Sequence, residues 1–440
     1  MKNDRIKILQ IITESPQTLD YTLPLFFNLK DKNNYDVVIL YCCLNRKRLT
    51  KDSVYLKDID KLSNVKSYDL SSFSNFPTSS FISIVRPILG ASIANPLSIK
   101  NFILGIEIFG VKGLANLFTA FKKKIEDFIV RHTLEPAKLI NTINPDIIFF
   151  DNRSKFKNLA SEYIAKQIMK SKYKIKIIPH APHGISSDDE FIPILTNHYP
   201  KNVEYWSSLK AAIPQWEKDS KILSEYRHVG LPPLDNHWYK FILQKRKLLR
   251  NKQYLTILYI PQKIREKGDR GLIPQFDLID YEVELKNISK IVTDIDSQGI
   301  PFKLVIKPHP KISMNTIKSL IYELDHSSIS CSFEPLFYQI EHSNFVISEF
   351  STAAIFCACF IPILIVDSKL ECDVRNSWNV LDNLYGGINL RYNIDNLKIT
   401  MGMCKKSIEK KMVNNNRRHL ESHFGDDSIK NIMQSIQTFL

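Results

Sequence analysis

Short apolar runs recur along this chain, and most of them stop abruptly at polar residues. Segments that favour helices lie between many of these runs, as at residues 18–29, 114–143, 159–170 and 428–440. Short buried strands separated by helices are typical of a parallel sheet with helices on both faces. The sequence therefore predicts an α/β fold. Strands are expected at residues 6–12, 35–41, 65–70, 145–151, 174–178, 203–207, 255–260, 302–307, 329–332, 345–347 and 363–366.

The length of the chain and one turn-rich segment predict two domains. A chain of 440 residues is too long for one ordinary hydrophobic core. The segment Gly230-Leu-Pro-Pro-Leu-Asp235 is rich in turn-forming residues and lies between two series of strands. We therefore expect two Rossmann-like domains that face a central cleft, formed by residues 1–235 and 236–440.

The composition describes a globular protein with an excess of positive charge. Hydrophobic residues make up 44% of the chain and charged residues 24%, which excludes a disordered protein. The net charge of +14 favours anionic partners such as nucleic acid, anionic lipid or phosphorylated substrates. No nucleic-acid-binding motif and no basic patch interleaved with aromatic residues stands out, so we expect no nucleic acid as a partner.

The cysteines and the amino terminus favour a cytoplasmic protein. None of the seven cysteines forms a C-x-x-C pair, and most lie in apolar runs, as reduced and buried cysteines do. The amino terminus is charged and leads directly into a strand-length apolar run, which is not the pattern of a signal peptide.

Residues 81–121 form an unusually apolar insertion in the first predicted domain, followed by Lys122, Lys123 and Lys124. Its scattered charges, prolines and glycines argue against a helix that spans a membrane. One interpretation is a pair of buried helices. The other is an interfacial segment that docks on an anionic inner-membrane surface, which would make the protein peripheral on that membrane.

Two predicted strands of the second domain end at residues that suit an anion. The segment Lys303-Leu-Val-Ile-Lys-Pro-His-Pro310 ends at Lys307 and His309, and Asn344-Phe-Val-Ile-Ser-Glu-Phe-Ser-Thr-Ala353 runs into a helix of small residues. Open α/β sheets bind ligands at the carboxyl ends of their strands, and a helix start with free N–H groups attracts anions. We expect the two strands to be neighbours and their ends to bind a diphosphate or phosphodiester.

His309 lies between Pro308 and Pro310, which restrict the backbone on both sides of it. The imidazole is therefore preorganised to stabilise charge on a departing phosphate. A structural histidine that caps the strand is the alternative interpretation.

Further polar residues are expected at the same edge of the second domain. The hydroxyl groups of Ser348, Ser351 and Thr352 could contact phosphate, or could cap the following helix without any ligand. Other donor-binding candidates are Gln262 and Lys263, which follow the strand at 255–260, and Glu334 and Glu349, which could contact a ribose.

In the first domain, candidate catalytic groups follow the strand at 174–178. His183 precedes the flexible Gly184, and Asp188 and Asp189 come shortly afterwards. A histidine or a carboxylate with a raised pKa can serve as a general base near neutral pH. The alternative is a polar loop whose acids are simply solvated.

Several motifs are absent from the sequence. It contains no G-x-x-x-x-G-K-[ST] and no G-x-G-x-x-G, which disfavours a P-loop NTPase and a dinucleotide oxidoreductase. No D-x-D of the kind that holds a metal-bound sugar nucleotide is evident. We therefore expect no cofactor and no metal site.

The order of these motifs resembles that of bacterial GT-B transferases that build surface polymers. The closest groups are the CDP-glycerol glycerophosphotransferases and the capsule Kdo transferases and polysialyltransferases. The resemblance implies that His309, Ser351 and Thr352 bind the donor phosphate in a C-terminal nucleotide-donor domain. It also implies that the catalytic base of an N-terminal acceptor domain is His183, or else Asp188 or Asp189. This chain has Asp-Asp-Glu-Phe where the capsule groups have acid-acid-Gly, and Pro182 where a tryptophan is expected.

The resemblance leads to a functional prediction. We expect a metal-independent glycosyltransferase that moves a sugar from a CMP- or CDP-type donor to a cell-surface glycan or a lipid-linked acceptor. A CDP-glycerol-type polyol-phosphate transferase, a sugar-nucleotide epimerase and a non-catalytic carbohydrate-binding scaffold are the alternatives.

Overall fold

The computed structural model describes the chain in segments. The described residues are 5–12, 18–29, 32, 34–41, 61–69, 136–151, 164, 168, 172–178, 202–208, 226–249, 254–265, 278–309, 312, 314–349, 351–367, 391–393 and 406–439. The apolar insertion at 81–121 and the lysines that follow it lie outside these residues.

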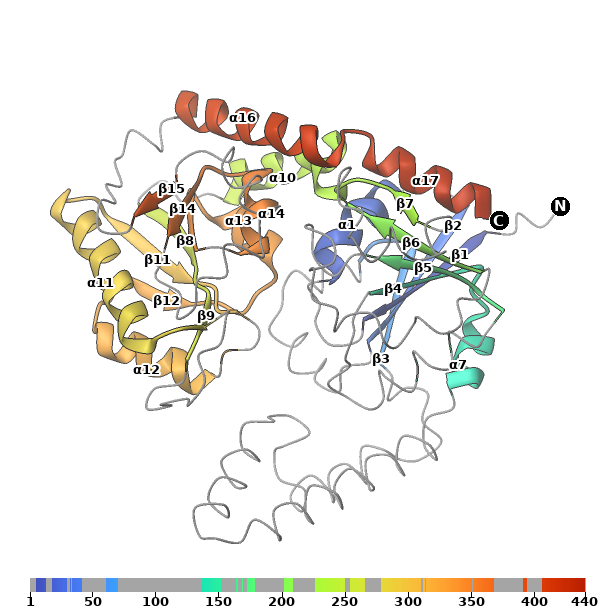
Figure 1. Ribbon diagram of the computed structural model, residues 1–440, viewed down its shortest axis with the longest axis horizontal. Helices are drawn as coiled ribbons and strands as arrows, with labels where there is room; N and C mark the ends of the chain where they lie inside the picture. Colours follow the sequence, from blue (N-terminus) through green and yellow to red (C-terminus); the bar gives the residue numbers. More distant parts are fainter. Residues whose placement is uncertain are drawn as a thin grey trace, which may run out of the picture.

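The first sheet contains seven strands in the order β3-β2-β1-β4-β5-β6-β7, and every neighbouring pair is parallel (Figure 1). The chain adds two strands on one side of β1 and then crosses to its other side. This is the strand order of a Rossmann fold. The strands are β1 (Ile6–Ile12), β2 (Tyr35–Tyr41), β3 (Val65–Asp69), β4 (Ile147–Asp151), β5 (Lys174–Ile178), β6 (Val203–Ser207) and β7 (Tyr226–His228).

The second sheet repeats this arrangement with six parallel strands in the order β12-β11-β8-β13-β14-β15. Here β8 occupies the central place that β1 has in the first sheet. A separate pair of two-residue strands, β9 and β10, lies beside it. The strands are β8 (Leu255–Ile260), β9 (Lys263–Ile264), β10 (Leu278–Ile279), β11 (Phe302–Ile306), β12 (Ile329–Cys331), β13 (Phe345–Ser348), β14 (Ile363–Asp367) and β15 (Arg391–Asn393).

The predicted α/β fold with two Rossmann-like halves is confirmed, and the predicted strands have bounds within about two residues of the observed ones. The apolar runs are good predictors because helices cover both faces of a parallel sheet, so a central strand is apolar throughout. All six residues of β8, for example, are buried. The short strands β7, β9, β10 and β15 were not predicted, since two or three residues carry no recognisable pattern.

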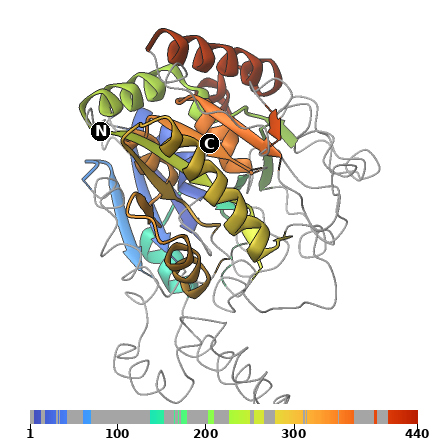
Figure 2. The same cartoon turned by 90° about the vertical axis from the view of Figure 1, so that its left-hand side faces the viewer.

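The helices surround and connect the two sheets (Figures 1 and 2). In both views α16 and α17, drawn in red, form a layer along the same side of the molecule. No helix among the described residues is long and apolar enough to cross a membrane. The bounds are α1 (Thr18–Leu29), α7 (Pro136–Ile143), the 3-10 helix η5 (Pro232–Leu234), α10 (Asn236–Leu249), α11 (Tyr281–Ser297), α12 (Met314–Leu324), α13 (Leu336–His342), α14 (Thr352–Ala358), α16 (Lys406–Phe424) and α17 (Ser428–Phe439).

One apolar cluster contains buried residues of both halves, and Trp238 of α10 belongs to it. Trp238 of α10 is buried and packs edge-on against Phe27 of α1, with ring centroids 5.4 Å apart. On its other side Trp238 packs edge-on against Phe337 of α13, at 5.2 Å. Because α1 belongs to the first half and α13 to the second, α10 fixes the two sheets relative to each other.

Helix α17 returns from the second half to the first sheet. Lys176 of β5 is fully buried, and its Nζ lies 2.9 Å from a carboxylate oxygen of Glu204 on β6. The same ammonium donates to the Ser435 hydroxyl of α17 at 3.0 Å, and Trp206 Nε1 donates to that hydroxyl at 3.1 Å. The predicted domain boundary at residue 235 stays a prediction. Helix α17 follows this boundary in the sequence and contacts the first sheet.

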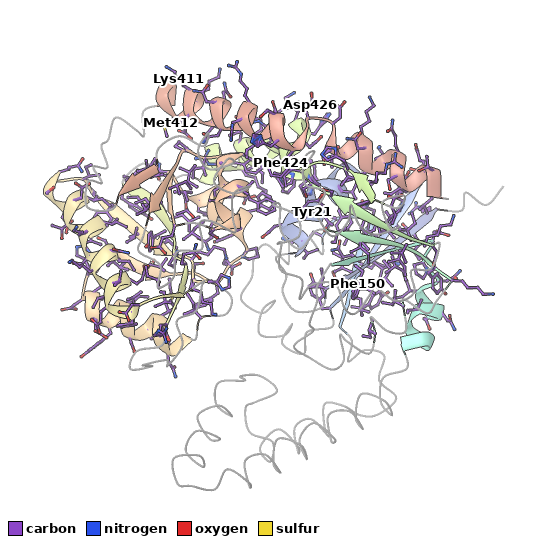
Figure 3. The ribbon with its side chains drawn as sticks, viewed as in Figure 1. Tyr21, Phe150, Lys411, Met412, Phe424 and Asp426 are labelled. Atoms are coloured by element: carbon purple, nitrogen blue, oxygen red, sulfur yellow. The ribbon has the colours of Figure 1, made fainter. Side chains whose placement is uncertain are left out.

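The turn-rich segment 230–235 is held by contacts from both halves. Tyr21 of α1 donates to the Gly230 carbonyl at 2.8 Å, and Arg417 of α16 donates to the Leu234 carbonyl at 2.6 Å. Gly230 has a φ of +81°, and a Cβ at this position would lie 2.8 Å from the carbonyl oxygen of Phe424. Tyr21 and Phe424 mark this place in Figure 3. Both the backbone conformation and the lack of space require glycine.

We predict that Gly230→Ala lowers the free energy of unfolding by more than Gly299→Ala does. Gly299 also has a positive φ, +64°, but a Cβ there would meet nothing within 4 Å. The left-handed conformation alone costs an alanine about 1–2 kcal/mol, and the clash with the Phe424 carbonyl should add at least about 1 kcal/mol. Urea unfolding of both variants measures the difference. Equal losses would show that the close approach at Gly230 is relieved without cost.

Candidate functional site

The candidate site lies at the carboxyl edge of the second sheet, where the strand order reverses. Strand β8 pairs with β11 on one side and with β13 on the other. The chain builds outward through β11 and β12, then returns to start again at β13, so the strand order reverses between β8 and β13. Ligands bind at such switch points in open α/β sheets.

This order corrects one prediction. The strands that end at Lys307 and Ser348 are not neighbours, because β8 lies between them. The crossover after β12 places β13 on the far side of β8, which puts the two ends about 10 Å apart, or two strand spacings. The ends of three strands, β11, β8 and β13, therefore contribute to this edge. Pro261 and Gln262 follow β8, the middle strand of the three.

Glu349 joins the ends of β8 and β13 at the switch point. Its backbone N–H donates to the Ile260 carbonyl at 3.0 Å, and its carboxylate accepts from the Gln262 backbone N–H at 2.5 Å. The glutamate is fully buried. Glu349 thus has a structural role, because it holds the turn after β8. This role explains why an acidic residue lies at an edge that is expected to bind anions. Lys263 is half-buried in β9, which pairs with β10.

A second buried acid, Glu284 of α11, lies close to Glu349. It interacts with Glu349 and with Tyr259 of β8. Burial raises the pKa of Glu284 well above its usual value, and the neighbouring Glu349 raises it further. Glu284 therefore keeps its proton to a higher pH than an ordinary glutamate does. Sequence reasoning missed it, because one glutamate near the start of a helix of mixed polarity carries no sign that it is buried.

Lys307 is buried directly after β11. Its Nζ donates to the backbone carbonyl of Glu334 at 2.9 Å, so the predicted donor-binding residue Glu334 holds this lysine through its main chain. Burial lowers the pKa of Lys307, while Asp20, Cys357 and Glu334 act in the opposite direction. An ammonium has three donors, and two remain after the bond to Glu334.

His309 follows in a tight turn. Its carbonyl accepts from the Ile312 N–H at 2.9 Å, and its side chain is half-buried. The backbone carbonyl of His309 is thus held on this side, and the predicted preorganisation of the imidazole stays a prediction. The contact between His309 and a donor phosphate stays a prediction.

The hydroxyl groups after β13 have different partners. The Ser348 hydroxyl is buried and donates to the Glu349 carbonyl at 2.7 Å. Ser351 caps α14, where its hydroxyl accepts from the Ala353 N–H at 3.3 Å. Thr352 is the first residue of α14, and its side chain is outside the described part. Contact of these hydroxyls with phosphate stays a prediction for all three residues.

The first domain contributes an acid that sequence reasoning did not select. Asp20 lies in the first turn of α1, which follows β1 and so starts at the carboxyl edge of the first sheet. Its side chain is 4% exposed. Burial raises the pKa of Asp20 to about 7, and the Lys307 ammonium of the second domain acts against this rise. This interaction shows that the carboxyl edges of the two sheets face each other.

The predicted base candidates cannot be placed. His183, Asp188 and Asp189 all lie outside the described residues. Within the part of the chain that is described, no three histidine, cysteine, aspartate or glutamate side chains are grouped so that they could hold a metal ion.

Comparison with known proteins supports the fold. No protein-family model matches the chain, and no curated protein matches it. A crystal structure provisionally assigned as a UDP-N-acetylglucosamine 2-epimerase from Listeria monocytogenes is similar, with 12% identity over 99% of this chain and 96% of that one and a TM-score of 0.51. At this identity the likeness concerns the fold. The chain thus has a GT-B-like fold of two Rossmann-like domains.

Two further structures match over nearly the full length of the chain with lower scores. One is the wall teichoic acid polymerase TagF, with 9% identity over 100% of this chain and 90% of that one and a TM-score of 0.46. The other is a glycosyltransferase from Rickettsia africae, with 12% identity over 99% and 98% and a TM-score of 0.43.

The raised pKa of Glu284 predicts a pH-dependent stability. Because the folded state holds this proton more tightly than the unfolded state, stability should fall as the pH rises above the ordinary glutamate pKa, by up to about 1.4 kcal/mol per pH unit. Glu284→Gln should reduce this slope, to which Asp20 with its raised pKa also contributes, and should stabilise the protein at pH 8. Chemical denaturation between pH 5 and pH 8.5 measures the effect, with Glu282→Gln, an exposed acid in the same helix, as the control. An unchanged slope in Glu284→Gln would contradict the assignment of the proton to this pair.

Proposed function

We propose that this protein is a metal-independent transferase that moves a sugar from a CMP- or CDP-type nucleotide donor to a cell-surface glycan or a lipid-linked acceptor. The observation that carries the proposal is the switch point of the second sheet, where Gln262, Lys307 and Ser351 follow three adjacent strands. A nucleotide phosphate that lies there would meet a buried ammonium and a helix cap, and it would face the first domain.

The proposed chemistry is a single displacement. A base of the first domain, either His183 or one of Asp188 and Asp189, takes the proton of an acceptor hydroxyl. The acceptor oxygen then forms a bond to the sugar carbon as the bond from that carbon to the nucleotide breaks. The nucleotide leaves with an additional negative charge, which Lys307 and His309 stabilise. Groups that are fixed before the reaction stabilise such charge without reorganising.

The excess of positive charge supports an anionic environment for the acceptor. A net charge of +14 attracts negatively charged surfaces over distances longer than a contact. An anionic polymer, or the anionic cytoplasmic surface of a membrane, would attract such a positively charged protein. The predicted peripheral attachment through residues 81–121 belongs to this proposal.

A nucleotide-sugar epimerase is the second candidate, since the structure with the highest similarity reported above is assigned to that activity. The two reactions differ in their need for an acceptor. Thermal-shift and calorimetric binding with CDP-glycerol, CMP-Kdo, CMP-sialic acid and UDP-N-acetylglucosamine identifies the donor. Turnover of that donor with and without a membrane glycan extract then separates transfer from epimerisation. Turnover that does not need the extract would replace the transferase with the epimerase.

We predict that His309→Ala lowers turnover at least about a hundredfold, the usual effect of losing a group that stabilises charge in the transition state. His326→Ala is the control, because His326 precedes β12 at the opposite, amino-terminal edge of the sheet and pairs with Asp296 at 2.9 Å. An unchanged rate in His309→Ala would contradict the proposed role, whereas no turnover of any donor by the wild type would favour a non-catalytic binding protein.

An exposed aromatic residue lies at the same edge of the sheet. Phe333 follows β12 by two residues, and its side chain is 46% exposed although it is large and apolar. The next residue, Glu334, holds Lys307 through its carbonyl. An aromatic ring beside a phosphate site suits a nucleobase, because every base has a face that can stack on it.

We therefore predict that Phe333→Ala weakens nucleotide binding. Loss of one stacked base costs about 1–3 kcal/mol, which corresponds to roughly a 5- to 150-fold rise in Kd. Tyr322→Ala is the matched control, since Tyr322 is the other exposed large hydrophobic residue in the described part and lies on α12. Isothermal titration calorimetry gives both values. Equal affinities for the two variants would exclude Phe333 from the base site.

A further inference from the structure

Asp20 is a buried acid, and one of its two carboxylate oxygens lacks a hydrogen-bond partner among the described residues. Its side chain is 4% exposed, and the oxygen concerned is Oδ1. A buried carboxylate oxygen without a hydrogen bond is costly. The residue lies at the carboxyl edge of the first sheet, where it faces the second domain.

Among the described residues, two groups of the second domain interact electrostatically with Asp20. Lys307, at the end of β11, lowers the pKa of Asp20. Cys357 of α14 interacts with both Asp20 and Lys307, but burial raises the pKa of its thiol, so it is neutral at pH 7. Glu334 acts on Lys307, and Arg246 of α10 acts on Cys357. His309 lies two residues beyond Lys307.

Asp20 and Lys307 influence each other without a direct ion pair. Among the described residues no contact within 4 Å joins the two charged groups, and the Lys307 ammonium instead donates to the Glu334 carbonyl at 2.9 Å. A carboxyl group close to one ammonium, but not bound to it, responds to any further charge that arrives beside that ammonium. With a pKa of about 7, Asp20 is about half protonated at neutral pH.

We propose that Asp20 belongs to the anion site of the second domain, where it acts through Lys307 and takes up a proton when a nucleotide diphosphate binds beside that lysine. The inference rests on the proposed function, because it requires an anionic ligand at the end of β11. The diphosphate adds negative charge near Asp20, which favours the neutral form of the carboxyl group. Proton binding and diphosphate binding must then strengthen each other by the same factor.

The direction of the pH effect follows from this coupling. At pH 6 Asp20 is mostly neutral and does not oppose the diphosphate. As the pH rises past 7, an ionised Asp20 repels the ligand and competes for the charge of Lys307. If the ligand raises the pKa of Asp20 by one unit, Kd should rise toward tenfold between pH 6 and pH 8.5, with an uptake of about 0.4 proton at pH 7.

Isothermal titration calorimetry of the full chain tests this with CDP-glycerol and UDP-N-acetylglucosamine as probes. Their substituted diphosphates do not change charge between pH 6 and pH 8.5, so any proton exchanged comes from the protein. Titrations at pH 7 in two buffers with different ionisation enthalpies give the proton uptake of the wild-type protein directly. This measurement needs no variant.

The variants assign the proton to a residue. Asp20→Asn, which imitates the neutral carboxyl group, should bind at pH 8.5 nearly as tightly as the wild type does at pH 6. Asp36→Asn is the matched control, because Asp36 lies near the amino end of β2, at the opposite edge of the sheet, and pairs with Arg5.

The outcomes separate this inference from the proposed function. Proton uptake that disappears in Asp20→Asn and persists in Asp36→Asn supports it. Tight binding without proton uptake by the wild type, or an equal pH slope in the wild type and Asp20→Asn, overturns the role of Asp20 and leaves the proposed function standing. No binding of either probe at any pH overturns the inference, and the proposed function is overturned as well if CMP-Kdo and CMP-sialic acid also fail to bind.

Discussion

The reversal of strand order at the centre of each sheet determines where chemistry can occur in this protein. When a chain builds a parallel sheet outward from one strand and then crosses to its other side, the two connections leave a gap at the carboxyl edge. In the second sheet that gap lies between β8 and β13. The turn after β8, the buried Lys307 and the cap of α14 all lie at this edge because their strands end there.

The site also depends on how the two sheets are held. Trp238 of α10 packs against α1 on one side and α13 on the other, so one buried indole lies between the two halves. The same arrangement brings the start of α1 toward the end of β11. Asp20 and Lys307, which are far apart in the sequence, can interact only because the carboxyl edges of the sheets face each other. The electrostatics of the site are therefore a property of both domains.

The sequence predicted the strands well and the site in part. Apolar runs that end at polar residues identify central strands, and the same reasoning placed Lys307 and His309 at a strand end. It could not order the strands, so it made β11 and β13 neighbours. It also missed Asp20 and Glu284, because the sequence pattern does not distinguish a single buried acid in a helix from a solvated one. Nothing in the residue pattern showed that Ser435 would contact β5 and β6, since long-range packing has no local signal.

The contact between Ser435 and the first sheet has a consequence for biosynthesis. A ribosome completes β5 and β6 long before residue 435 emerges, so the buried ammonium of Lys176 must wait for its hydroxyl partner until the whole second domain has been translated. The nascent first domain exposes that face in the meantime. Maturation of the amino-terminal half is thus tied to the synthesis of α17, and a chain halted between the domains would leave a lysine in the sheet without one of its native partners.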